Sequence, residues 1–188
     1  NGRPLGGPMI LRVGIKDVMP KLVAHQLLEP TLQMTEDVRL LCYEGDITKL
    51  IADLAIHKLD VVLSDTPIDP SIKVKAYSHL LGESDVVLVG TKSLAKKLKA
   101  GFPGSLNGAP LLLPMKNTLL RRSLDYFFEE IDVRPKVVGE FEDSAMLKMM
   151  GKAGVGAFPV ASAICKEVEE MYGVECIAKI PNLTEKYY

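Results

Sequence analysis

Four aspartates stand where a predicted strand gives way to a loop or a helix. Asp17, Asp46 and Asp65 follow apolar segments in the first half of the chain, and Asp143 follows one in the second half. A carboxylate at such a point can cap the next helix, repel an anion, or give an oxygen ligand to a cation such as sodium or calcium. The elements around these aspartates decide between the three roles.

Length, charge and cysteine content narrow the class of protein. The chain has 188 residues, enough for one large domain or two small ones, and a formal net charge of -1, which gives no basic footprint for nucleic acid. No apolar run approaches the ~20 residues of a membrane span, so we expect no membrane partner. Three cysteines and three histidines are scattered without a pairing or ligand motif. We therefore expect reduced thiols, a cytoplasmic location, no cofactor and no firm metal site.

The first half of the chain alternates apolar strands with amphipathic helices. Pro20 is placed to open the first helix, and Pro30 to kink or end it. This order is typical of a parallel sheet with helical crossovers. The strands are predicted at 11–15, 38–46 and 61–65, and the helices at 18–33 and 46–60.

The second half repeats the pattern. Strands are predicted at 84–90, 109–114, 134–143, 155–159 and 175–180, and helices at 93–102, 117–131, 144–154 and 161–173. Ligands of open parallel sheets bind beyond the carboxyl ends of the strands. The pattern predicts an α/β protein of two Rossmann-like lobes, joined by a hinge, with a binding cleft between them.

Several segments, in this order, resemble the effector-binding domain of LysR-type transcriptional regulators. They are "LRVGI", "VRLLCYEGDITKLIADLAIHKLDVVLSD", "ESDVVLVG" and "AGVGAFP", and the likeness extends over about residues 10–180. Three further segments resemble one branch of that family, the sodium-responsive activators of sodium/proton antiporter genes. These are "HLLGESDVVLVG", "FPGSLNGAPLLLP" and "VRPKVVGEFEDSAMLK".

The resemblance implies a fold like that of type 2 periplasmic binding proteins, with crossovers near 83–87 and 159–163. It also implies a homodimer or tetramer, and contact with DNA only through an N-terminal helix-turn-helix domain that this chain lacks. The expected division is a linker remnant at 1–9, lobe one at 10–84 plus 162–188, and lobe two at 85–161.

The resemblance further implies where an effector binds: after the first strand, at the start of the following helix, and at strand ends of lobe two. The candidates here are Asp17, Val18, Gly45, Asp46, Ser64, Asp65, Asn117, Thr118, Asp143 and Phe158. Many family members recognise organic anions through hydroxyls and helix N-terminal amides after the first strand. In this chain Asp17 occupies that place and would repel a carboxylate. A cation such as sodium, or a neutral polar effector, is favoured, with Asp17 and Asp143 as hypothetical cation contacts.

Plainer interpretations stand beside these. The acids can be helix caps, worth ~0.5–2 kcal/mol each, and Lys16 and Lys116 can neutralise them. Arg121 and Arg122, adjacent on an amphipathic helix, are expected to be solvated. The wide apolar arc of the helix at 19–33 fits burial against a partner chain or against a neighbouring element of the same chain.

Taken together, the sequence predicts an effector-binding and oligomerisation domain of a transcriptional regulator. An enzyme is not expected, because the chain has no nucleophile elbow, no phosphate loop and no histidine at a cleft position. The alternative is an extracytoplasmic solute-binding protein of the same two-lobed fold. A signal peptide in the full-length sequence would favour that alternative.

Overall fold

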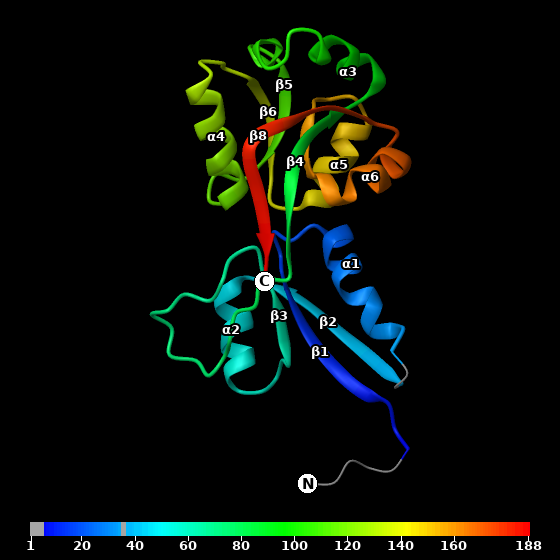
Figure 1. The fold of residues 1–188 in the computed structure, drawn as a ribbon, viewed down its shortest axis with the longest axis vertical. Helices are drawn as coiled ribbons and strands as arrows, with labels where there is room; N and C mark the ends of the chain where they lie inside the picture. Colours follow the sequence, from blue (N-terminus) through cyan, green and yellow to red (C-terminus); the bar gives the residue numbers. More distant parts are fainter. Residues whose placement is uncertain (1–5, 35–36) are drawn as a thin grey trace. The chain divides into compact units, whose positions relative to one another are not determined.

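The computed structural model describes residues 6–34 and 37–188, which divide into two compact units (Figure 1). The first unit extends to Gly82 and takes up the chain again at Lys186–Tyr188, and the second is Glu83–Glu185. The chain passes between the units within two strands, β4 and β8. Residues 1–5 of the predicted linker lie outside the described residues.

The first unit is a parallel three-stranded sheet with the strand order β2-β1-β3. Gly14 of β1 allows one of its helices to approach closely, because a Cβ there would lie 2.9 Å from a methyl group of Leu50. The strand–helix alternation expected from the sequence is confirmed. Its elements are β1 (Met9–Lys16), α1 (Lys21–Leu32), β2 (Val38–Gly45), α2 (Ile47–Ala55) and β3 (Val61–Leu63).

Proline sets both ends of α1. Pro20 is the residue before its first turn, and Pro30 lies inside its last turn, so the helix ends two residues later at Leu32. Within this helix only Val23 and Ala24 are buried. None of the helices in the described part of the chain is long and apolar enough to cross a membrane.

The second unit contains a three-stranded sheet, β7-β4-β8, and a parallel pair, β5-β6. A parallel bridge between Leu111 and Ala157 connects β5 to the stretch just before β7. Two 3-10 turns, Gly104–Leu106 and Ser162–Ile164, complete the unit. Its regular elements are β4 (Gly82–Gly90), α3 (Lys92–Lys99), β5 (Pro110–Pro114), α4 (Leu119–Glu130), β6 (Lys136–Phe141), α5 (Ser144–Lys152), β7 (Phe158–Ala161), α6 (Cys165–Tyr172) and β8 (Glu175–Tyr187).

This unit differs from the sequence-based expectation in two ways. First, β4 and β7 pair antiparallel, whereas the repeated pattern predicted parallel strands throughout. Apolar periodicity identifies buried residues but not strand direction, which accounts for the difference. Second, residues 162–185, assigned to lobe one from the sequence, pack within the second unit. The placing of a functional hinge between the lobes stays a prediction.

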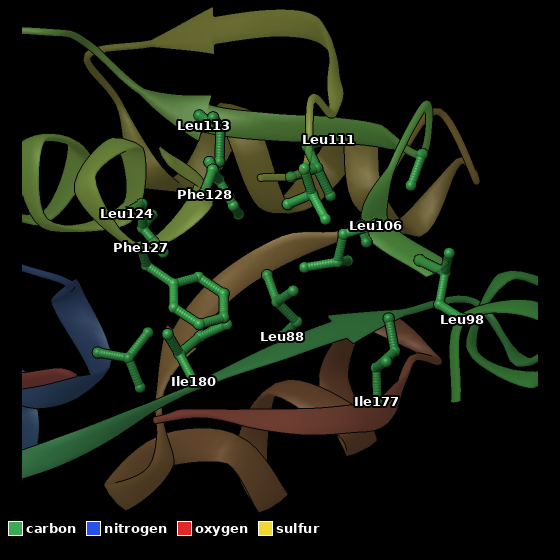
Figure 2. Close-up of a cluster of buried hydrophobic side chains, with 14 of the residues drawn as sticks. Leu88, Leu98, Leu106, Leu111, Leu113, Leu124, Phe127, Phe128, Ile177 and Ile180 are labelled. Atoms are coloured by element: carbon green, nitrogen blue, oxygen red, sulfur yellow. The ribbon is translucent and has the colours of Figure 1, made fainter. Parts of the chain in front are cut away.

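An apolar core fills the second unit between its sheets and α4 (Figure 2). Leu88 of β4, Leu111 and Leu113 of β5, and Leu124 of α4 are all fully buried. Each such side chain contributes ~1.5–3 kcal/mol of transfer free energy when it leaves water. Figure 2 shows them pointing toward one another, together with Phe127, Phe128, Ile177 and Ile180. This core fixes the positions of the strand ends described below.

Gly151 of α5 gives a test of this packing. A Cβ at that position would overlap the ring of Phe158, which is itself fully buried. We expect Gly151→Ala to lower the free energy of unfolding by about 1–3 kcal/mol, although alanine is the better helix former. Urea unfolding measures the change. Gly104→Ala is the matched control, because nothing lies within 4 Å of its Cβ, and it should change stability by less than about 0.5 kcal/mol.

Candidate functional site

In the first unit, all six of the candidate residues lie at the carboxyl edge of the sheet. Lys16 and Gly45, the last residues of β1 and β2, are partners in register. The amide of Asp17 donates to the carbonyl of Gly45 over 3.0 Å, which holds the two loops together. Asp46 follows Gly45 directly. Ser64 and Asp65 follow β3, so the parallel pairing brings these predicted residues to one edge as expected.

The aspartates at this edge differ in whether their carboxylates already have a partner within the protein. Lys16 Nζ lies 2.7 Å from a carboxylate oxygen of Asp65, and both side chains are largely buried. Asp65 is therefore neutralised by Lys16, as one of the plainer interpretations foresaw. The carboxylate of Asp17 is exposed, and no hydrogen bond or ion pair of it is seen among the described residues. Asp17 is the acid of this edge that is most open to a ligand.

Ser64 and Val18 are less available. Ser64 is buried, and its hydroxyl accepts the amide of Thr66 over 3.1 Å. The backbone of Ser64 also exchanges two hydrogen bonds with Tyr188. Val18 is half-buried in the turn between β1 and α1. These two residues shape the edge, and neither has a polar side-chain atom free for a ligand.

In the second unit, the corresponding edge is formed by the ends of β5 and β6. Pro114 and Phe141 are partners in register, and the amide of Met115 donates to the carbonyl of Phe141 over 3.2 Å. Asn117 and Thr118 follow β5, and Asp143 follows β6. These three predicted residues therefore belong to the carboxyl ends of two paired parallel strands. Asn117 and Asp143 are exposed.

Three of the candidates cap helices. Asp46 accepts the amide of Lys49 at the start of α2, Thr118 that of Arg121 in α4, and Asp143 that of Ala145 in α5. The capping interpretation of Asp46 and Asp143 is thus confirmed. In both residues the bond uses the same oxygen, Oδ1, at 3.0 and 2.8 Å. The second oxygen of each carboxylate is left for water or a ligand.

Phe158 is the candidate that the structure removes from this edge. The sequence placed it at the end of a strand, but it is the first residue of β7 and is fully buried. Its ring lies against Gly151 of α5. Phe158 is a core residue. An apolar run in a sequence does not show at which of its residues the strand begins.

Arg121 is a polar residue of this edge that the sequence interpretation missed. It was expected to be solvated, like Arg122, yet it is 4 % exposed, whereas Arg122 is exposed. Its guanidinium donates to Glu140 (2.6 Å), to Asp125 (3.0 Å) and to the carbonyl of Pro114 (2.9 Å). Arg121 therefore joins α4 to the ends of both β5 and β6. The helical spacing to the buried Leu124 was the signal that distinguishes it from its neighbour.

The charges of this cluster reinforce one another. Burial of Arg121 disfavours its charged form, but hydrogen bonds to Glu140 and Asp125 outweigh that effect and raise the pKa of Arg121. The hydrogen bond from Arg121, with smaller help from the charges of Arg121 and Lys116, holds the pKa of Glu140 below its ordinary value of 4.5. The carboxylate of Glu140 is thus bound to Arg121 and is not available to bind a ligand.

No preformed metal site stands out: among residues 6–34 and 37–188, no group of three or more His, Cys, Asp and Glu side chains could hold an ion. The first unit has a cavity of about 490 Å³ between α2, β3 and the loop that follows β3. Ser64 is the one candidate residue in its lining. The strand-end acids and this mainly apolar cavity are separate features of the first unit.

Comparison with known proteins gives the class of the chain. Residues 8–173 match the family model described as "LysR substrate binding domain". Curated relatives are the transcriptional activator protein NhaR of Escherichia coli and that of Shigella flexneri, each 27 % identical over 180 residues. That match covers 96 % of this chain and 59 % of each relative, so the chain spans little more than half of their length.

Solved structures agree. The OxyR2 E204G regulatory domain from Vibrio vulnificus superposes with a TM-score of 0.73 at 17 % identity, covering all of this chain and 87 % of that one. The effector binding domain of QuiR in complex with shikimate gives 0.65 at 16 % identity, covering 97 % and 86 %. These likenesses confirm the predicted α/β fold of the periplasmic-binding-protein type.

The chain is therefore a ligand-binding domain of a regulatory protein. More narrowly, it belongs to the LysR substrate binding domain family, with NhaR proteins among its relatives. The family and these relatives are regulators of transcription rather than enzymes, which confirms the expectation that the chain is not an enzyme.

The buried arginine can be tested against its exposed neighbour. Arg121→Met removes three hydrogen bonds and leaves the Pro114 carbonyl without its donor. We expect the free energy of unfolding to fall by about 1–3 kcal/mol, since the two acids can still be solvated by water. Arg122→Met should change it by less than about 0.5 kcal/mol. Equal effects of the two substitutions in urea unfolding would show that Arg121 does not stabilise this edge.

The same pair predicts a pH dependence. Because the pKa of Glu140 is lowered in the folded protein, its contribution is complete above its ordinary value of 4.5 and is lost as pH falls through the lowered value. The stability gap between the unmodified protein and Arg121→Met should therefore narrow between about pH 6 and pH 3. Unfolding midpoints at several pH values measure this gap. Glu140→Gln should reduce the narrowing over that range, because only the contact of Arg121 with Asp125 then remains.

Proposed function

We propose that this chain is the effector-binding and oligomerisation domain of a sodium-responsive, NhaR-like transcriptional activator located in the cytoplasm. A DNA-binding domain, outside this chain, would carry the contact with the operator. The effector would be held by the strand-end residues, and its binding would shift the population of conformations that the attached domain senses. The observation that carries the proposal is the match to NhaR over 96 % of this chain.

The chemistry of the strand ends favours a cation over an anion. Asp17 leaves an exposed carboxylate after β1, and Asp143 keeps one oxygen beyond its capping bond. Hard cations take several oxygen ligands, which backbone carbonyls, water and the amide oxygen of Asn117 can complete. The Lys16–Asp65 pair already balances its own charges and would not compete for the ion.

An organic anion is the second candidate effector, since the QuiR domain is known in complex with shikimate. The start of α1 supports it, because no side chain caps the first turn of that helix and its amide N–H groups can donate hydrogen bonds to an anion. Asp17 opposes it through like-charge repulsion. The negative charge of Asp17 favours a cation and opposes an organic anion. A substitution that neutralises this charge therefore distinguishes the two candidate effectors.

Calorimetric titration of the purified chain tests the cation. Sodium, lithium, potassium and calcium chlorides are compared at fixed ionic strength and pH, and we expect sodium to give saturable heat. Asp17→Asn and Asp143→Asn should each weaken its binding several-fold by removing a charged ligand. Asparagine retains capping ability at Asp143, so α5 stays intact.

The control is Asp132→Asn, an exposed acid in the turn between α4 and β6 whose positive φ of 50° asparagine tolerates well. It should leave sodium binding unchanged. Equal, negligible heats for all four cations would overturn the cation proposal. Saturable binding of shikimate that strengthens in Asp17→Asn would favour the organic anion instead.

Self-association of the chain is supported by the exposed apolar side of α1. Leu32 and Met34 are more than half exposed, and Leu22, Leu27 and Leu28 are only half-buried. A helix that buried its whole apolar arc within its own unit would not leave these side chains in water. A second copy of the chain would cover them.

Sedimentation velocity measures this association. Leu32→Lys should weaken the dimer at least tenfold, because a leucine leaving water contributes ~1.5–3 kcal/mol and a lysine in its place must be desolvated. A cation in the last turn of α1 should not harm the helix itself. Met171→Lys on α6, equally exposed at 56 % against 57 %, is the control and should leave the dimer intact. A monomeric unmodified chain at all concentrations would contradict the proposal.

A further inference from the structure

Two cysteines of the second unit come together at one glutamate. Cys165 begins α6, and its thiol donates to Glu169 one helical turn later, over 3.7 Å. Gly173 ends that helix in the left-handed conformation, and the chain returns at once as β8. The amide of Cys176 in β8 then donates to the same oxygen of Glu169, over 2.9 Å.

This short return brings both cysteines to one carboxylate oxygen of Glu169, close enough for each thiol to affect the pKa of the other. Both residues are half-buried, so a small oxidant can reach them while bulky thiols are hindered. The third cysteine, Cys42 of β2, is exposed and lies in the other unit.

We propose that Cys165 and Cys176 form a reversible disulfide when the protein meets hydrogen peroxide, and that this bond fastens the start of α6 to β8. Cys176 attacks first. Its thiolate takes one oxygen from the peroxide, the O–O bond breaks, and the leaving hydroxide is protonated to water. The sulfur of Cys165 then displaces the new hydroxyl from Cys176, which leaves as water with the proton of the Cys165 thiol. Two thiols lose two electrons and two protons, and the peroxide becomes two waters.

The surroundings assign these roles. Burial, then the charges of Cys176 and Glu169, raise the pKa of Cys165 to about 12. Burial and the charge of Glu169 also raise the pKa of Cys176, but a hydrogen bond with Cys165 and, more weakly, the charge of Lys99 of α3 oppose them. Lys99 is itself paired with Glu175 at 4.0 Å. Cys176 is therefore the better nucleophile, and Cys165 the thiol that resolves the sulfenic acid.

The raised pKa values also set the conditions of the reaction. Few thiolates are present at neutral pH, so the disulfide forms slowly there and faster as pH rises. The pair therefore responds to sustained or strong oxidation rather than to brief exposure. Once formed, the bond connects α6 to a strand that continues into the first unit at Lys186.

The experiment uses the chain with Cys42→Ser, which removes intermolecular disulfides. It is treated with excess hydrogen peroxide at pH 7 and pH 9, alkylated, and analysed by intact mass and by digestion without reductant. We expect a loss of two hydrogens, no alkyl groups, and one cross-linked peptide pair that contains Cys165 and Cys176. Dithiothreitol should restore both thiols, and the reaction should be faster at pH 9.

Two substitutions test the assigned roles. Glu169→Gln keeps an oxygen that can accept from the Cys176 amide but removes the negative charge, so the pKa of Cys176 should fall. Disulfide formation should then become about threefold faster for each pH unit by which that pKa falls. Lys99→Gln should slow it. Glu170→Gln, exposed on the same helix, should do neither.

Either of two results would overturn the proposal. One is oxidation of the two cysteines to separate sulfinic acids without a cross-link. The other is that Cys165 and Cys176 both remain fully open to alkylation after peroxide treatment at pH 9. The reference for that treatment is the Cys165→Ser, Cys176→Ser variant, in which the same conditions must oxidise Cys42 completely.

Discussion

Both units share one constraint: a helix that starts just past a parallel strand has first amides that need oxygen acceptors, and a side chain supplies them for every such helix described except α1. Asp46, Thr118 and Asp143 supply them for α2, α4 and α5. The bond fixes the direction in which each helix leaves its strand, and thereby the packing of the helix on the sheet. The same side chains stand at the edges where ligands of this fold class bind. Helix capping and ligand binding therefore use the same side-chain oxygens. A carboxylate can take part in both at once because it has two oxygens.

Arg121 adds the electrostatic part of this arrangement in the second unit. A guanidinium that is 4 % exposed is costly to desolvate, and three acceptors from two strands and its own helix offset that cost. Its planar fork matches this set of acceptors in a way that a lysine ammonium would not. Glu140 is held by this contact, so the negative potential open to a ligand at this edge comes from Asp143 and not from Glu140. Of the three acids at residues 140–143, Glu140 is therefore structural, whereas Glu142 and Asp143 are exposed.

The fold was largely predictable because apolar periodicity and helix caps are local signals. The strands and helices of the first unit, and the caps at Asp46 and Asp143, follow from residues within one or two turns of each other. Features that depend on distant partners were not predictable. The antiparallel pairing of β4 with β7 and the burial of Phe158 against Gly151 are settled by tertiary packing. The Lys16–Asp65 pair spans 49 positions, and only its possibility could be read from the sequence.

The last strand, β8, connects these separate features. It was predicted to end at residue 180 but continues to Tyr187, and it carries Cys176 in the second unit. Its far end is held in the first unit, where Leu81 donates to the carbonyl of Tyr187 over 2.7 Å and Tyr188 pairs with Ser64. Ser64 directly precedes Asp65, the acid neutralised by Lys16 at the end of β1. A displacement of β8 therefore reaches the strand-end loops of the first unit through its backbone hydrogen bonds. A shift of one residue would turn Ile177, Ile180 and Leu183 out of the apolar core, so the register of β8 is strongly specified.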